Sequence, residues 1–161
     1  MNTRRAVAAV ALAAVAVATV VVVFFPGFLI GDPGPYNETT VTVSDENGTE
    51  LGTVDVRIAD TRAKRYTGLS ETASLDPDEG MLFVHDEEDQ HSYVMRDMSF
   101  PLDITFVDAN GTIVQIFHAG VDGENAPYEA RGKYVLETNR GWANRTGVST
   151  GDTVDVPDSV G

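Results

Sequence analysis

The sequence predicts a mainly β protein: a small β-sandwich or partly closed barrel with one short helix, preceded by an N-terminal transmembrane helix. Three observations support this prediction. Residues 6–30 form one apolar run. Beyond them, short segments alternate apolar and polar residues, which is typical of half-buried strands. Two Asn-Gly pairs, Asn47-Gly48 and Asn110-Gly111, favour tight turns between such strands.

The apolar run follows a basic pair, Arg4 and Arg5. A helix of about 20 residues spans roughly 30 Å, the thickness of the hydrocarbon core of a bilayer. Basic residues favour the cytoplasmic side, so we expect residues 1–5 in the cytoplasm, residues 6–30 as a single-pass anchor in the cell membrane, and the C-terminal domain outside. The alternative is a signal peptide, cleaved to release a secreted domain, although such apolar regions usually have only about 7 to 15 residues.

The chain is strongly acidic, with a net charge of −14, and all 25 acidic residues follow the apolar run. This charge repels nucleic acid and anionic lipid headgroups, so no nucleic-acid partner is expected. The acids are scattered through the turns and strand edges, which favours adaptation to high salt and a haloarchaeal-type source; a cation-binding surface is the alternative. The chain lacks cysteine, so its stability depends on packing rather than on disulfides.

Behind the anchor we expect a Gly- and Pro-rich linker (31–38), a β-rich extracytoplasmic domain (39–157) and a tail (158–161). The expected strands are 39–44, 51–58, 81–85, 92–95, 102–108, 113–118, 134–138 and 153–156. Polar loops are expected at 86–90 and 119–131.

One helix is expected over residues 61–67, with Asp60 as its N-terminal cap and with Ala63 and Tyr66 facing the sheet. A tight helical turn is expected at 141–147.

Two-residue turns at the Asn-Gly pairs determine which strand residues face one another. The first turn pairs Val41 with Val54, and the second pairs Asp103 with His118. Facing β-carbons are about 5 Å apart, a separation that an Asp–His hydrogen bond can bridge. Such a pair occurs in catalytic dyads, but with no nucleophile at a recognisable spacing a structural pair at the sheet margin is the favoured interpretation.

No cofactor and no metal are predicted. His85 and His91 flank an acidic loop, but their spacing matches no established metal motif, and a solvated turn explains the acids. Asn-x-Thr sequons, which allow glycosylation outside the cell, occur at Asn37, Asn47, Asn110 and Asn144.

The ordered motifs resemble those of the domain of unknown function 192 family, over about residues 52–156. The motifs that carry the resemblance are Gly68-Leu69, Gly80-Met81-Leu82-Phe83-Val84, Tyr93-Val94-Met95-Arg96, Pro101-Leu102-Asp103-Ile104, Tyr134-Val135-Leu136-Glu137, Gly141 and Gly151-Asp152. The resemblance implies a compact, mainly β domain, often secreted or membrane-anchored, with no established reaction.

The polar positions of the family fall on Arg96, Asp103 and Glu137, which become candidate ligand-binding residues together with His118. The chain departs from the family pattern near Arg96, because Val94 replaces a usual Trp and Asp97-Met98 replaces a usual Asn-Thr. A usual Arg after Gly68-Leu69 is also missing.

Three functions are compatible with the sequence. The favoured one is a membrane-tethered extracytoplasmic domain that binds a small ligand, a glycan or an envelope protein. The second is a hydrolase or lyase that uses Asp103, Glu137 or His118 as acid and base. The third is a purely structural envelope module. A pocket that brings Arg96, Asp103 and Glu137 together would favour the enzyme.

Overall fold

A computed structural model describes residues 31–121 and 126–160. The predicted cytoplasmic residues and anchor, residues 1–30, lie outside this part of the chain, so the transmembrane helix remains a prediction. Within the described part, neither helix has the length and apolar character needed to cross a membrane.

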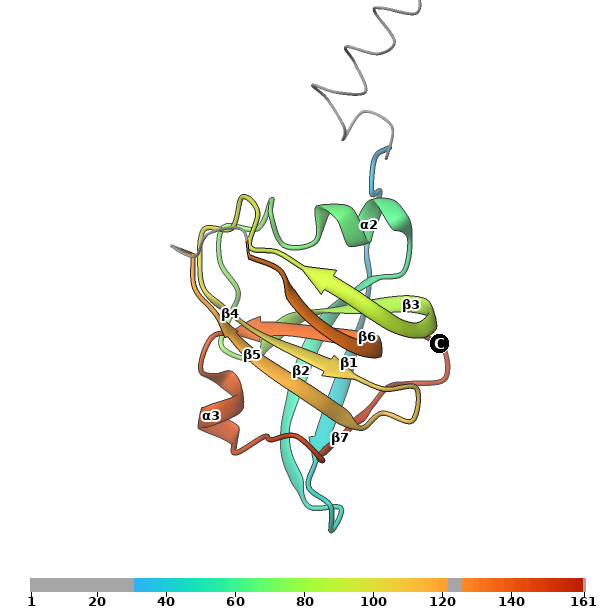
Figure 1. The fold of residues 1–161 in the computed structure, drawn as a ribbon, viewed down its shortest axis with the longest axis vertical. Helices are drawn as coiled ribbons and strands as arrows, with labels where there is room; N and C mark the ends of the chain where they lie inside the picture. Colours follow the sequence, from blue (N-terminus) through green and yellow to red (C-terminus); the bar gives the residue numbers. More distant parts are fainter. Residues whose placement is uncertain (1–30, 122–125, 161) are drawn as a thin grey trace, which may run out of the picture. The chain divides into compact units, whose positions relative to one another are not determined.

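The described domain is one curled sheet of seven strands in the order β5-β4-β6-β3-β2-β1-β7 (Figure 1). In chain order the elements are β1 (Asn37–Ser44), β2 (Glu50–Ala59), α2 (Arg62–Thr67), β3 (Glu79–Tyr93), β4 (Leu102–Val107), β5 (Ile113–Ala119), β6 (Tyr128–Asn139), α3 (Trp142–Thr146) and β7 (Thr153–Asp155). Neighbouring strands are antiparallel except β2 and β3, which are parallel and joined through α2.

The sheet curls until β7 meets the turn between β4 and β5 (Figure 1). Ile113 N donates to Asp152 O at 2.8 Å, and Val154 N donates to Gly111 O at 2.7 Å. These bonds connect the two ends of the strand order. The fold is therefore a half-barrel, so the partly closed barrel describes it better than the sandwich.

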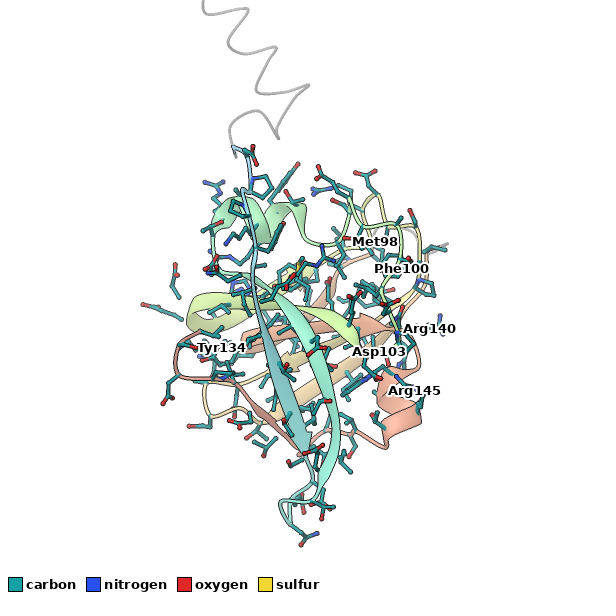
Figure 2. All side chains as sticks on the ribbon, turned by 180° about the vertical axis from the view of Figure 1, so that it is seen from behind. Met98, Phe100, Asp103, Tyr134, Arg140 and Arg145 are labelled. Carbon is teal, nitrogen blue, oxygen red and sulfur yellow. The ribbon has the colours of Figure 1, made fainter. Side chains whose placement is uncertain are left out.

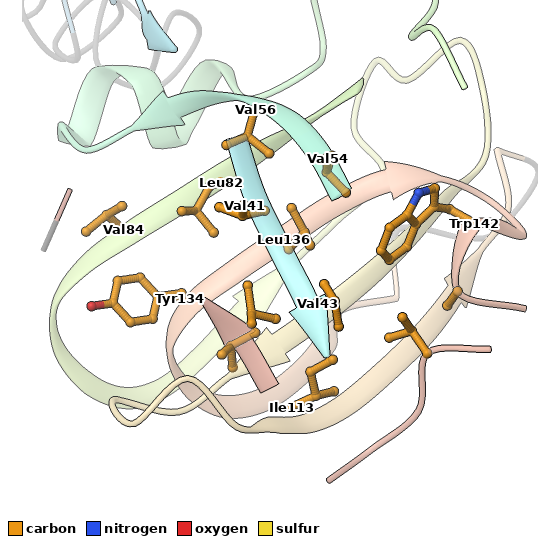
Figure 3. Close-up of a cluster of buried hydrophobic side chains, with 14 of the residues drawn as sticks. Val41, Val43, Val54, Val56, Leu82, Val84, Ile113, Tyr134, Leu136 and Trp142 are labelled. Carbon is orange, nitrogen blue, oxygen red and sulfur yellow. The ribbon is translucent and has the colours of Figure 1, made fainter. Parts of the chain in front are cut away.

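Both faces of the sheet are buried, because successive residues of a strand point to opposite sides. On β3, Leu82 and Val84 enter one apolar cluster with Val41, Val54 and Trp142 (Figure 3). The alternate β3 residues, Met81 and Phe83, enter a second cluster. Strands β3, β4 and β6 separate the two clusters, so neighbouring residues on these strands belong to different environments.

The predicted strand pairs are confirmed, but the predicted two-residue turns are wrong. Val41 pairs with Val54 and Asp103 pairs with His118, as the sequence indicated. The loops are nevertheless one residue longer, spanning 46–48 and 109–111, because Asp45 N donates to Thr49 O and Asp108 N donates to Thr112 O. A bulge next to each loop restores the predicted register.

The two loops share the sequence Asp-x-Asn-Gly-Thr and one hydrogen-bond pattern. Asp45 Oδ1 accepts from the backbone N–H groups of Asn47 and Thr49, at 2.9 and 2.8 Å. Asp108 Oδ1 repeats both bonds in the second loop, at 2.8 and 2.9 Å. The glycines, Gly48 and Gly111, have φ of 79° and 88°, a region that glycine enters without steric cost.

The expected break between strands 81–85 and 92–95 is wrong, because β3 runs through it as one strand with a bulge between Val84 and Asp89. The acidic segment is polar enough to read as a loop, yet its backbone pairs with β6. Strand β6 accordingly begins at Tyr128, inside the expected loop 119–131.

The α2 cap and buried face also differ from the prediction. Thr61, not Asp60, is the N-cap, with its hydroxyl oxygen accepting from Lys64 N at 3.2 Å. Asp60 instead pairs with Lys64 Nζ at 2.9 Å, which allows Lys64 to lie 7% exposed. Tyr66 faces outward rather than toward the sheet. The tight turn at 141–147 is confirmed as α3.

Candidate functional site

The candidate site is a cavity of about 180 Å³ between α2, the segment after it, and the ends of β3 and β6. Its walls are mostly apolar, and its charged lining residues are Arg65, Arg96 and Glu137. The apolar and aromatic lining residues are Tyr66, Leu69, Phe83, Tyr93, Val94, Met98 and Leu102. Two of the four predicted site residues, Arg96 and Glu137, therefore share one cavity.

Glu137 is the most buried of the three charged residues that line the cavity. It is 6% exposed and lies between Met81 of β3 and Ile104 of β4, both fully buried. Among the described residues its carboxyl group has neither a hydrogen-bond partner nor an ion-pair partner. Burial raises the pKa of Glu137 from 4.5 to about 8, because the charged form loses its hydration. At neutral pH the cavity therefore holds a mostly neutral carboxylic acid.

Arg96 lies at the mouth of the cavity, where its side chain is 40% exposed. Its Nη2 donates to Tyr66 O at 2.7 Å, and its guanidinium carbon lies 4.1 Å from the centre of the Tyr66 ring. Its Nε is 3.7 Å from the Asp97 carboxylate. A guanidinium carries five N–H donors, so these contacts fix its plane and leave donors unused.

Two other polar residues, Arg65 and Tyr93, line the cavity but were not among the four candidate ligand-binding residues. Arg65 Nη1 donates to Asp60 O at 2.9 Å and to Val84 O at 2.7 Å, which holds α2 against β3. The Tyr93 hydroxyl lies 2.9 Å from His85 Nε2. The pKa of Tyr93 is well above its usual value, through burial and then the nearby Glu137 charge. In the sequence, Arg65 belongs to a basic cluster on the expected helix 61–67, and Tyr93 begins the family motif that ends at Arg96; these were the signals that could have found them.

Asp103 and His118 form the predicted pair, but neither residue lines the cavity. The fully buried Asp103 carboxylate contacts His118 Nδ1 at 2.6 Å through Oδ1. Its Oδ2 accepts from Gly141 N and Ala143 N, both at 3.0 Å, at the start of α3. Figure 2 shows Asp103 with Arg140 and Arg145, apart from the cavity residue Met98 near α2. The two Oδ2 bonds thus fix α3 to β4, and the Oδ1 contact connects β4 with β5, so the carboxylate has a structural role.

The four predicted residues therefore divide between two faces of the sheet. Asp103 pairs across the sheet with Thr138, the residue next to Glu137 on β6. Consecutive strand residues point to opposite faces, so Asp103 and Glu137 cannot act on one substrate as acid and base. The pocket that would have favoured the enzyme, with Arg96, Asp103 and Glu137 together, does not form.

His85 and His91 lie close together, with stacked rings whose centroids are 3.5 Å apart. Burial, then the neighbouring His91, lowers the pKa of His85 to about 4, so this ring is neutral near pH 7. His85 Nε2 is already engaged by Tyr93. Over 31–121 and 126–160, no group of three or more His, Asp or Glu residues is arranged to hold a metal ion.

The half-barrel, with its cavity beside α2, defines the chain as a small β domain with a partly enclosed, mostly apolar site. The chain belongs to the DUF192 family, described as "Uncharacterized ACR", whose model matches residues 42–156. The resemblance drawn from the ordered motifs is therefore confirmed.

Two solved structures share this fold. One, from Sinorhizobium meliloti, is described as a "putative transcription regulator"; it is 31% identical, with a TM-score of 0.71 over 78% of this chain and 97% of that chain. The other, a protein of unknown function from Novosphingobium aromaticivorans, is also 31% identical, with a TM-score of 0.66 over 74% of this chain and 85% of that chain. No curated protein matches the chain.

Proposed function

We propose that this protein is a binding module: a membrane-tethered, extracytoplasmic domain that holds a small ligand in the cavity between Arg96 and Glu137. The apolar run at 6–30 and the acidic composition support the tethered, salt-adapted setting. The acidic surface opposes nucleic-acid binding, even though one relative carries a regulator's description.

The observation that carries the proposal is the buried Glu137 carboxyl group without a partner. Burying a polar group without hydrogen bonds costs free energy, so a buried carboxyl group with no partner in the protein favours a partner that enters from the cavity. Glu137 borders a cavity that opens to solvent beside a fixed Arg96. A ligand in the cavity would supply the missing hydrogen bonds.

The hydrolase or lyase alternative loses support, because Asp103 and His118 lie on the other face from Glu137. The structural alternative differs from the proposal in one measurable respect, since a purely structural module needs no ligand in the cavity.

The test is a small-molecule screen by thermal unfolding, using the full chain in detergent. The single tryptophan, Trp142, is buried, so its fluorescence reports unfolding without a label. The proposal expects compounds that raise the melting temperature of the wild type and of Glu129→Gln, an exposed control on β6, but not of Glu137→Gln. Hits that act equally on all three proteins, or no hits at all, would favour the structural module or a protein partner.

A further inference from the structure

We infer that the cavity takes a small organic anion, a carboxylate with a short apolar body, whose charged end binds Arg96. This inference rests on the proposed binding function and adds the chemical class of the ligand. The alternative occupant of a cavity that contains a buried acid is an amine, and the cavity's charges distinguish the two.

The charged groups that line the cavity favour an anion. Arg65 and Arg96 are both cationic, and Glu137 is the only acidic residue in the lining. Its burial keeps it neutral at pH 7. Even with the exposed Asp97 carboxylate 3.7 Å from Arg96 Nε, two guanidinium groups and a neutral acid leave the site net positive. Such a site repels an ammonium ion and attracts a carboxylate, although the chain as a whole carries −14.

Arg96 is arranged to receive a carboxylate. Its stacking on Tyr66 and its bond to Tyr66 O restrain the guanidinium before any ligand arrives. A planar guanidinium forms paired hydrogen bonds with the two oxygens of a carboxylate, and a restrained one loses less entropy in doing so. Arg65, with Nη1 held by two backbone oxygens, adds positive charge but is tied to α2 and β3.

The rest of the cavity suits a short hydrocarbon. Leu69, Phe83 and Leu102 are nearly fully buried in its walls. Its volume of about 180 Å³ equals roughly six water-sized groups, so a chain of about five carbons fits.

The groups around Glu137 keep it neutral when such an anion binds. Its cross-strand neighbours Met81 and Ile104 are apolar, and they offer it no charge. The charged and titratable groups that share the cavity with it are Tyr93 on β3, engaged by His85, Arg65 on α2, and Arg96 in the segment after β3. An anion is therefore compatible with protonated Glu137, whereas an amine would require Glu137 to ionise.

The experiment uses three probes of equal length, pentanoate, pentan-1-ol and pentylammonium, titrated into the full chain at low salt by calorimetry. We expect pentanoate to bind at pH 6.5 and to lose at least about tenfold in affinity at pH 9.5, where Glu137 is ionised. Pentylammonium should bind more weakly at pH 6.5. Stronger binding of pentylammonium or pentan-1-ol in the cavity would overturn the anion inference and leave the binding function intact.

Arginine variants test whether the carboxylate of the ligand binds Arg96. Arg96→Gln should lose at least about tenfold in pentanoate affinity, whereas Arg131→Gln, an exposed arginine on β6, should not. Because Arg96 also holds Tyr66, Arg96→Lys is measured in parallel, with Trp142 fluorescence as the check of folding. Unchanged pentanoate affinity in a folded Arg96 variant would overturn the inference. If no probe binds and the wider screen also finds no ligand, the proposed function fails as well.

Discussion

Glu137 makes the stability of this domain depend on pH in an unusual direction. Its pKa in the folded protein is about 8, above the ordinary value of 4.5, because burial disfavours the charged form. The folded protein therefore binds a proton at Glu137 that the unfolded chain releases between these pH values. The contribution of Glu137 to stability is complete below about pH 4.5 and is lost as pH rises toward 8.

The size of the effect follows from this pKa difference. Each pH unit corresponds to about 1.4 kcal/mol, so a rise from 4.5 to about 8 costs about 5 kcal/mol once the group is ionised, and about 3 kcal/mol at pH 7. Glutamine has nearly the same shape and cannot ionise. Between pH 5 and pH 9, the unfolding free energy of Glu137→Gln should therefore rise by about 4 kcal/mol relative to that of the wild type.

The assay is urea unfolding at pH 5, 7 and 9, followed by Trp142 fluorescence. The relevant quantity is the difference in unfolding free energy between variant and wild type, since other groups cancel in it. His85, for example, titrates near pH 4 in both proteins and acts in the opposite sense. Exposed Glu129→Gln should show no such trend. A Glu137→Gln difference that stays within about 1 kcal/mol across this range would refute the reasoning.

Two further predictions concern the parts that hold the half-barrel together. Asp103→Asn should destabilise the fold by roughly 2 kcal/mol in urea unfolding, because a neutral amide oxygen accepts the two N–H bonds of α3 more weakly than the carboxylate and the amide nitrogen must then face His118. His118→Ala should cost about 1 kcal/mol or less, because its side chain is 42% exposed, and equal losses in the two variants would contradict the role of Asp103 in holding α3. Gly48→Ala should lose roughly 1 to 2 kcal/mol from backbone strain, and Gly111→Ala clearly more, since its new β-carbon would lie 2.6 Å from Val154 O; equal melting temperatures for the two variants would contradict the barrel closure.

The strand pairs could be predicted because they depend on local signals. Alternating side chains and an Asn-Gly turn determine which residues face each other within one hairpin, which is why Asp103 opposite His118 was accessible from the sequence. The extra residue in each loop and the bulge beside it could not be predicted, but their effects on the strand register cancel. The sequence did not predict that β3 is one continuous strand, because its acidic middle is polar enough to suggest a loop although its backbone pairs with β6.

The cavity depends on contacts that no local pattern encodes. Glu137 is buried because β6 lies between β3 and β4, a strand order that the sequence did not predict. The bonds from Gly141 and Ala143 to Asp103 join residues about forty positions apart, so the sequence did not predict why Asp103 is buried. The family motifs indicated which polar residues matter, and the strand order decides which of them act together.

Because the sheet separates Asp103 from Glu137, the two residues should behave as independent sites. Asp103 holds α3 on one face, and Glu137 borders the cavity on the other, with no shared hydrogen-bond partner. Effects of substitutions at sites without shared partners add to within about 0.5 kcal/mol. The double variant Asp103→Asn/Glu137→Gln should therefore show the sum of the single changes in unfolding free energy at each pH. A larger coupling would mean that the two carboxyl groups communicate through β6, and that one functional site extends across the sheet.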